Sequence, residues 1–194
     1  MVLKSNGKKG LILQSIFTKR KKKDSRELLR EELKRLAICE VMAIPNFWFV
    51  YVAWWLVFIT IGEDFVHTST IVYPLILLSF ILLQGSIYWY ICLRRIDGKK
   101  VPEKTPYIYT KLKIVNLFLI VIYLPIFLMF KVSIYHSLIG MFIYIFSILE
   151  YINYFFIRIS YKNPRHFFAN LKTGKFPKSQ IVKEIERSKR TKSI

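Results

Sequence analysis

The chain is poor in acidic residues, cysteine, histidine and clustered glycine, and each shortage excludes a kind of chemistry. Its 194 residues include 12 acidic residues against 31 lysines and arginines, with two cysteines, three histidines and seven isolated glycines. Isolated glycines form no glycine-rich phosphate loop, and the scattered histidines and aspartates lack metal-ligand spacing. Cys39 and Cys92 form no C-x-x-C pair. The sequence therefore predicts no cofactor and no metal site.

Long runs without charge make up much of the remaining sequence. Hydrophobic residues account for 54% of the chain, and the charged residues are concentrated in blocks between apolar runs. Apolar runs of about 20 residues are long enough to cross a bilayer as helices. We expect an all-α integral membrane protein whose transmembrane domain, residues 41–158, contains four transmembrane helices in two antiparallel hairpins. The predicted spans are residues 41–61, 71–93, 114–130 and 134–157.

A basic tail, residues 1–23, begins the chain. Each cation near an anionic membrane surface contributes about 1 kcal/mol of binding, so we expect this tail to bind anionic lipid. The cations expected to contact lipid are Lys19, Arg20, Lys21, Lys22 and Lys23.

Residues 24–40 have the pattern of an amphipathic helix. Asp24 can cap its first turn, with Glu27 as the reciprocal partner. An amphipathic helix directly before a span is expected to lie in the membrane interface; packing against a partner or the C-terminal tail is the alternative. Pro45 is expected at an elbow between this helix and the first span.

The distribution of cations predicts the orientation in the membrane. There are 12 Lys or Arg residues up to Glu40, 7 in residues 94–113 and 11 from Arg158 onward, whereas the two opposite loops contain only Lys131. Cytoplasmic loops carry an excess of Lys and Arg. We therefore expect a plasma-membrane protein with both termini in the cytoplasm, and a basic, partly helical cytoplasmic tail over residues 159–194.

Glu150 is the one carboxylate inside the fourth apolar run, and an acid in hydrocarbon is costly enough to indicate a role. At helical spacing a polar stripe accompanies it. The other members of this stripe are Ser147, Asn153, Tyr154 and Arg158.

If consecutive spans form hairpins, the residues that lie at the same depth as Glu150 and Glu40 can be predicted. If the third and fourth spans turn about Lys131, then Lys113 and Asn116 lie at the depth of Glu150 and Ser147. Glu150 is then a structural lock between the two spans, or alternatively the proton- or cation-binding acid of a transporter. The same reckoning for the first two spans predicts a second polar cluster, composed of Glu40, Arg94 and Arg95.

These features favour a non-catalytic membrane protein. A cysteine nucleophile needs a histidine beside it, and His67 and His136 are predicted near the opposite membrane surface from Cys39 and Cys92. We expect an accessory, immunity-type or scaffold component that binds a membrane-protein partner or anionic lipid through its basic cytoplasmic face. One alternative is a small oligomeric transporter or channel that uses Glu150; another is a lipid-modifying enzyme. A homo-oligomer is compatible with each, and nucleic acid is not an expected partner, because the cations alternate with apolar spans.

Overall fold

The computed structural model describes residues 5–61, 69–129, 134–157 and 178–192, and of residues 5–23, 58, 61 and 189–192 it describes the backbone only. Within these ranges the regular elements are all helices. They are α1 (Ser5–Ile61), α2 (Ser69–Ile96), α3 (Thr105–Met129), α4 (Ile134–Phe155) and α6 (Gln180–Lys192). An isolated β-bridge joins Ile157 to Lys178. The expected all-α class is confirmed.

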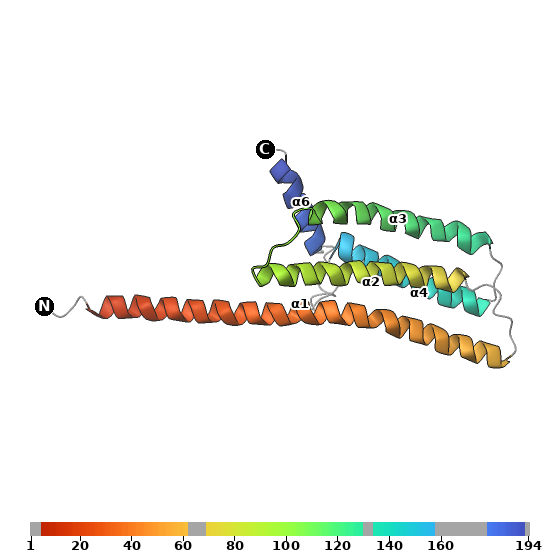
Figure 1. Cartoon of the computed structure of the whole chain (residues 1–194), viewed down its shortest axis with the longest axis horizontal. Helices are drawn as coiled ribbons and strands as arrows, with labels where there is room; N and C mark the ends of the chain where they lie inside the picture. The colour runs from red at the N-terminus through yellow and green to blue at the C-terminus, as the bar shows by residue number, and fades with distance from the viewer. Residues whose placement is uncertain (1–4, 62–68, 130–133, 158–177, 193–194) are drawn as a thin grey trace, which may run out of the picture.

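Helices α1 to α4 each contain an apolar stretch long enough to cross a bilayer. A helix rises about 1.5 Å per residue, so about 20 apolar residues match the hydrocarbon thickness. The four stretches overlap the predicted spans. Two helices continue beyond them: α2 runs on through Arg94 and Arg95, and α3 already begins at Thr105. From α1 to α4, each helix runs opposite to the one before it, as Figure 1 shows.

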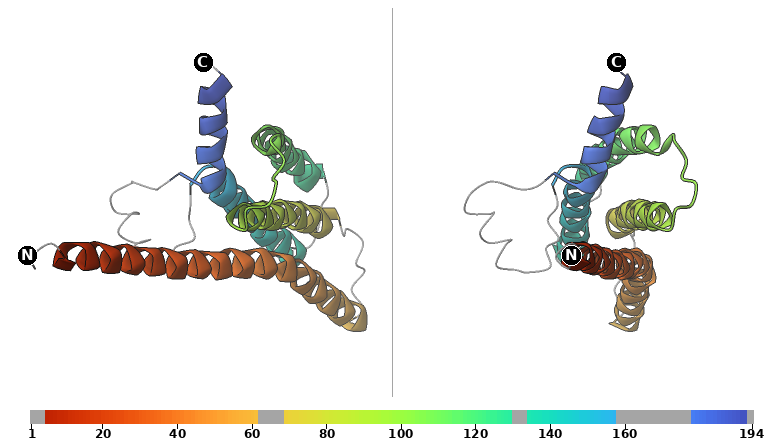
Figure 2. Two further views of the ribbon diagram at one scale, coloured as in Figure 1. Left: turned by 60° about the vertical axis from the view of Figure 1, so that its left-hand side comes forward. Right: turned by 90° about the vertical axis from the view of Figure 1, so that its left-hand side faces the viewer.

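The N-terminal part of the chain differs from the expectation. Helix α1 is continuous from Ser5 to Ile61, so Asp24 lies inside the helix and does not cap its start. Lysine, arginine, glutamate and leucine are all good helix formers, and nothing between residues 11 and 44 breaks their run. Pro45 lies inside the helix and ends no element. A proline removes one backbone hydrogen bond, which accounts for the bend in the orange part of α1 (Figure 2).

The segment 24–40 of α1 packs beside the end of α2. The Arg30 guanidinium pairs with Asp97 at 3.0 Å, and the Ser86 hydroxyl donates to the Ala37 carbonyl at 2.9 Å. Leu33 is buried. This part of α1 therefore contacts the bundle itself, while the helix extends past the bundle toward the N-terminus (Figure 1).

Helix α2 is the central helix of the bundle. It packs most extensively against α1 and α4 and also contacts α3, whereas α3 and α4 have little direct contact. The Trp48 indole donates to Ser79 at 3.1 Å across α1 and α2. Helices α3 and α4 are antiparallel, as expected for a hairpin, but they do not pack tightly on each other.

Helix α3 is attached to its neighbours largely through tyrosine hydroxyls. Five tyrosines on α2, α3 and α4 donate to backbone carbonyls on another helix, and each of these bonds has α3 as one partner. A helical carbonyl has a second lone pair available for such a bond. The bonds run from Tyr73 to Leu119 at 2.8 Å, Tyr109 to Gln84 at 2.8 Å, Tyr123 to Thr70 at 2.8 Å, Tyr144 to Ile120 at 3.0 Å and Tyr151 to Lys113 at 3.1 Å.

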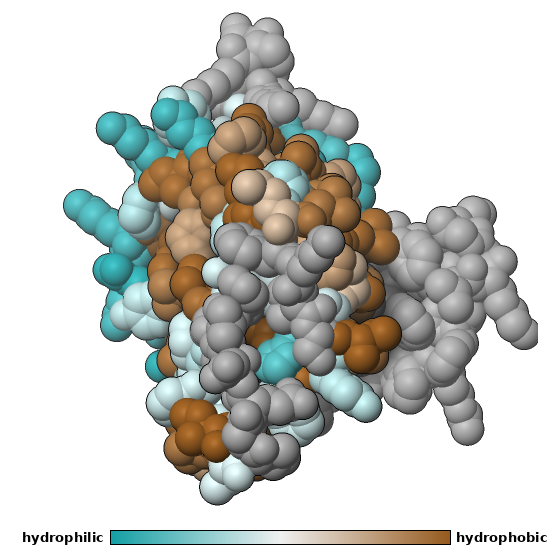
Figure 3. Space-filling view, turned by 90° about the vertical axis from the view of Figure 1, so that its right-hand side faces the viewer, coloured by the Kyte–Doolittle hydropathy of each residue, from teal (hydrophilic) through white to brown (hydrophobic). Residues whose placement is uncertain are grey.

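Charge is segregated along the bundle. Every described Lys or Arg side chain lies in residues 26–35, 94–113 or 178–187, and these segments meet where α2 ends, α3 begins and α6 docks. We call this the charged end. Seen from the opposite end, the described surface is mainly apolar, and most of its hydrophilic side chains lie at the edges (Figure 3). The bundle is therefore amphipathic along its length.

Candidate functional site: a groove between α1 and α4

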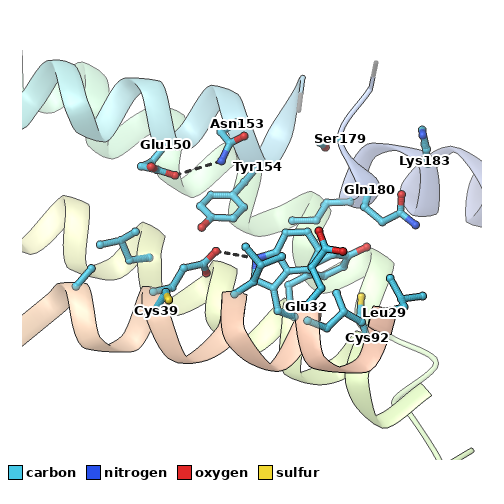
Figure 4. A pocket seen from close by; sticks show the side chains of 18 of the residues that line it. Leu29, Glu32, Cys39, Cys92, Glu150, Asn153, Tyr154, Ser179, Gln180 and Lys183 are labelled. Carbon is cyan, nitrogen blue, oxygen red and sulfur yellow. Dashed lines mark hydrogen bonds between the residues drawn. The ribbon is translucent and has the colours of Figure 1, made fainter. Parts of the chain in front are cut away.

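A cavity of about 1020 Å³ lies toward the charged end, and we call it the α1–α4 groove. Helices α1 and α4 form its two walls and α2 its floor, while the start of α6 closes its outer end. In Figure 4, Glu150, Asn153 and Tyr154 on α4 face Glu32 and Cys39 on α1 across this space. The part of the lining used below consists of Glu40, Ala43, Phe47, Leu82, Tyr88, Trp89, Phe146, Glu150, Asn153 and Tyr154.

The groove exists because both wall helices pack on α2 rather than on each other. At its inner end the walls do meet, where the rings of Phe47 and Phe146 lie 5.7 Å apart, centroid to centroid. Aromatic pairs at this separation attract one another beyond their buried area. The groove is therefore closed and apolar at one end and charged toward the other.

Gly85 shapes the floor. A Cβ atom placed on this residue would collide with the Tyr154 ring and with Oε2 of Glu40. Only a residue without a side chain allows both groups to lie directly on α2. The glycine thus brings an acid from α1 and a tyrosine from α4 together over the same point of the floor.

Glu40 is held by the floor helix. The Trp89 indole N–H donates to its Oε1 at 2.6 Å. Its Oε2 is buried beside the Tyr154 hydroxyl but has no hydrogen bond of good geometry. In the described part of the chain no ion pair joins Glu40 to Arg94 or Arg95. Glu40 and Arg95 line the same groove, and the polar cluster stays a prediction.

Arg95 instead pairs with Glu184 of α6 at 2.5 Å. The same carboxylate accepts a hydrogen bond from the Tyr88 hydroxyl at 2.9 Å. Ile181, nearby on α6, is buried. Arg95 therefore holds the C-terminal helix α6 against the bundle. The sequence did not predict this ion pair, because the place where α6 docks cannot be derived from its position along the chain.

Glu150 lies on the opposite wall and also faces the groove. Its carboxylate accepts a hydrogen bond from Asn153, one turn along α4, at 3.4 Å. It lines the same groove as Glu40. Among the described residues no hydrogen bond or ion pair joins Glu150 to α3, and Lys113 and Asn116 have other partners.

Asn116 is fully buried and forms a reciprocal amide pair with Gln84 of α2. The two bonds measure 2.7 Å and 3.1 Å. Lys113 places its ammonium 4.0 Å from the centroid of the Phe156 ring, an attractive cation–π geometry. Lys113 and Asn116 therefore have partners other than Glu150, and the amide pair ties α3 to α2.

The remaining stripe residues separate into two groups. Asn153 and Tyr154 line the groove with Glu150. Ser147 faces α2 instead. Its hydroxyl donates to the carbonyl of Ile143 in its own helix at 2.9 Å and lies 3.3 Å from the carbonyl of Pro74 in α2. Arg158 lies outside the described residues, as do the side chains of residues 19–23.

Sequence reasoning missed Gly85 and Trp89, through which α2 builds the floor, and Gln84, through which α2 is tied to α3. A signal was available, since Gln84 is the only amide in the second apolar run and is followed directly by a glycine. Within the described ranges, no three His, Cys, Asp or Glu side chains come together in a possible metal site.

Fold and site together define an all-helical protein with four potential membrane-crossing helices and an acid-lined, aromatic groove near its charged end. No protein-family model, curated protein or solved structure matches the chain.

Proposed function

We propose that the chain is a non-catalytic multi-pass membrane protein, an accessory, immunity-type or scaffold component, that binds anionic lipid through its charged end. The observation behind this proposal is the convergence of three basic segments at one end of an otherwise apolar bundle. The chain as a whole carries a formal net charge of +19. A cationic surface beside hydrocarbon attracts the headgroups of anionic lipids.

Orientation follows from the same segregation of charge. The positive-inside rule favours the charged end in the cytoplasm of a plasma-membrane protein, with both termini on that side. The cytoplasmic leaflet is the one rich in anionic lipid. Each cation at its surface contributes about 1 kcal/mol, so several cations together give firm but salt-sensitive binding.

The test uses the full-length protein in detergent, with native mass spectrometry counting retained phosphatidylglycerol and phosphatidylcholine. Wild type should retain phosphatidylglycerol preferentially, and added salt should remove the preference. Replacing Lys19, Arg20, Lys21, Lys22 and Lys23 by Gln should weaken it.

A matched variant with Arg at each of these five positions keeps the charge and should keep the preference. Equal retention of both lipids by wild type would refute the proposal.

The groove favours a second function, that of a small oligomeric transporter or channel using Glu150. Glu150 and Glu40 both line a cavity, and intramembrane acids commonly mark substrate and ion pathways. Four helices enclose no complete pathway here, since the groove lies between two walls on one floor. This function therefore requires self-association, and a strictly monomeric protein in detergent and in lipid nanodiscs would eliminate it.

A further inference from the structure

We propose that the α1–α4 groove is a binding site for a hydrophobic organic cation, an apolar body bearing an ammonium, phosphonium or guanidinium group. The charged group would lie between Glu40 and Glu150, with the apolar body directed toward Phe47 and Phe146. This inference is independent of lipid binding at the charged end, because it concerns different residues and a ligand of opposite charge.

In the described part of the chain neither acid has a counter-ion, and Arg95 and Lys178, which also line the groove, pair with Glu184 and Glu186 instead. Among the described residues neither Glu40 nor Glu150 forms an ion pair, and the hydrogen bonds they accept come from the neutral groups of Trp89 and Asn153. A carboxylate withdrawn from water is costly to keep charged unless a cation compensates it. A cationic ligand between the two walls supplies that compensation to both acids at once.

The aromatic lining fits an organic cation better than a metal ion. Trp89 on the floor and Tyr154 on the wall lie beside Glu40, and Tyr88 packs edge-on against Trp89 at 5.4 Å between centroids. Aromatic faces attract organic cations and are the usual lining of quaternary-ammonium sites. A hard metal ion would instead need about six oxygen ligands around one point, and within the described ranges no three His, Cys, Asp or Glu side chains come together to supply them.

The inner end of the groove accommodates the apolar body. Its lining there is aliphatic and aromatic, from Ala43, Phe47, Leu82 and Phe146. A volume of about 1020 Å³ is just above the usual range for sites that hold drug-sized molecules, so there is room for one. Since α1 and α4 do not pack together beside the acids, a ligand dissolved in the membrane could enter between them.

The experiment measures binding of tetraphenylphosphonium to the full-length protein by isothermal titration calorimetry in an uncharged detergent, with protein-free micelles subtracted. Tetraphenylborate, which has the same shape and the opposite charge, is the matched probe. We expect the phosphonium to bind and the borate not to bind, because only the cation compensates the acids.

Variants locate the site. Glu150→Gln and Glu40→Gln should each weaken phosphonium binding about tenfold or more. Glu103→Gln removes an equal charge from the exposed α2–α3 connector and should bind as wild type does. Absence of phosphonium binding, equal affinity in all three variants, or equally tight borate binding would overturn the proposal.

A second measurement needs no change to the acids, in case those variants fail to fold. Cys39 is exposed and lines the groove. In a Cys92→Ala background, saturating tetraphenylphosphonium should slow maleimide alkylation of Cys39 several-fold, and tetraphenylborate should not. An unchanged rate with the phosphonium would contradict binding in the groove.

Discussion

Gly85 determines how closely the groove's acid and tyrosine approach α2. Tyr154 and Glu40 occupy the space that a side chain at this position would fill. Both are on other helices, so a larger residue here must displace one wall of the groove. The consequence is local: the inner contact of Phe47 with Phe146 lies elsewhere and does not depend on this glycine.

The first prediction is that Gly85→Val destabilises the protein by about 1–3 kcal/mol, the usual cost of overpacking. The unfolding free energy can be measured by SDS titration in mixed micelles. Leu83→Val is the control, because Leu83 lies two residues away and faces outward, so this exchange should change stability little. A Gly85→Val protein as stable as the control would show that the groove relaxes without strain.

At the scale of elements, polar contacts decide which helices pair. Lipid is as apolar as leucine, so hydrophobic burial does not drive membrane helices together, and hydrogen bonds and close packing do so instead. Helix α3 has few buried side chains, yet it carries five tyrosine bonds and the amide pair of Gln84 with Asn116. These contacts hold it to α2 and α4.

The second prediction concerns this amide pair. Gln84→Leu and Asn116→Leu should each cost about 1–3 kcal/mol, because each leaves a buried amide without its partner. The double variant should cost less than the two single costs combined, because no amide is then left unpaired.

A double-mutant cycle on unfolding free energies in mixed micelles measures the coupling. The expected coupling is roughly 0.6–2 kcal/mol. Strictly additive effects would mean that the pair does not connect α2 to α3.

For the whole molecule, the segregation of charge is the dominant feature. The apolar length of the bundle matches a bilayer, and the cations gather at one end of it. Moving that end across a membrane would require desolvating many charges, which is why loops rich in Lys and Arg remain on the cytoplasmic side.

The third prediction is therefore a topology. In a Cys39→Ser, Cys92→Ala background, a cysteine replacing Glu63 should react with a membrane-impermeant maleimide on intact cells, and one replacing Lys99 should react only after permeabilisation. Lys99 lies in the α2–α3 connector at the charged end, whereas Glu63 comes two residues after the last residue of α1, Ile61, in the sequence. The reverse pattern would invert the orientation and with it the proposed lipid-facing surface.

The sequence by itself determined the number of long apolar helices and their approximate limits. A run of about 20 residues without charge is a local property, and it has the same meaning whatever its neighbours are. The amphipathic character of the bundle also follows directly from the order of charged and apolar blocks. The continuity of α1 was missed, because a capping pattern at Asp24 and a proline at residue 45 both resemble helix boundaries.

Only the tertiary structure decided which helices touch and what Glu150 faces. The sequence-based partners Lys113 and Asn116 assumed that neighbouring spans pack as a hairpin. Instead α2 lies at the centre, where Gly140 of α4 approaches the Thr70 backbone so closely that a Cβ would collide with it. Close contacts between membrane helices form where small residues and buried amides fit against a neighbouring helix. Which neighbour that is depends on the three-dimensional fit and not on the order of the helices along the chain.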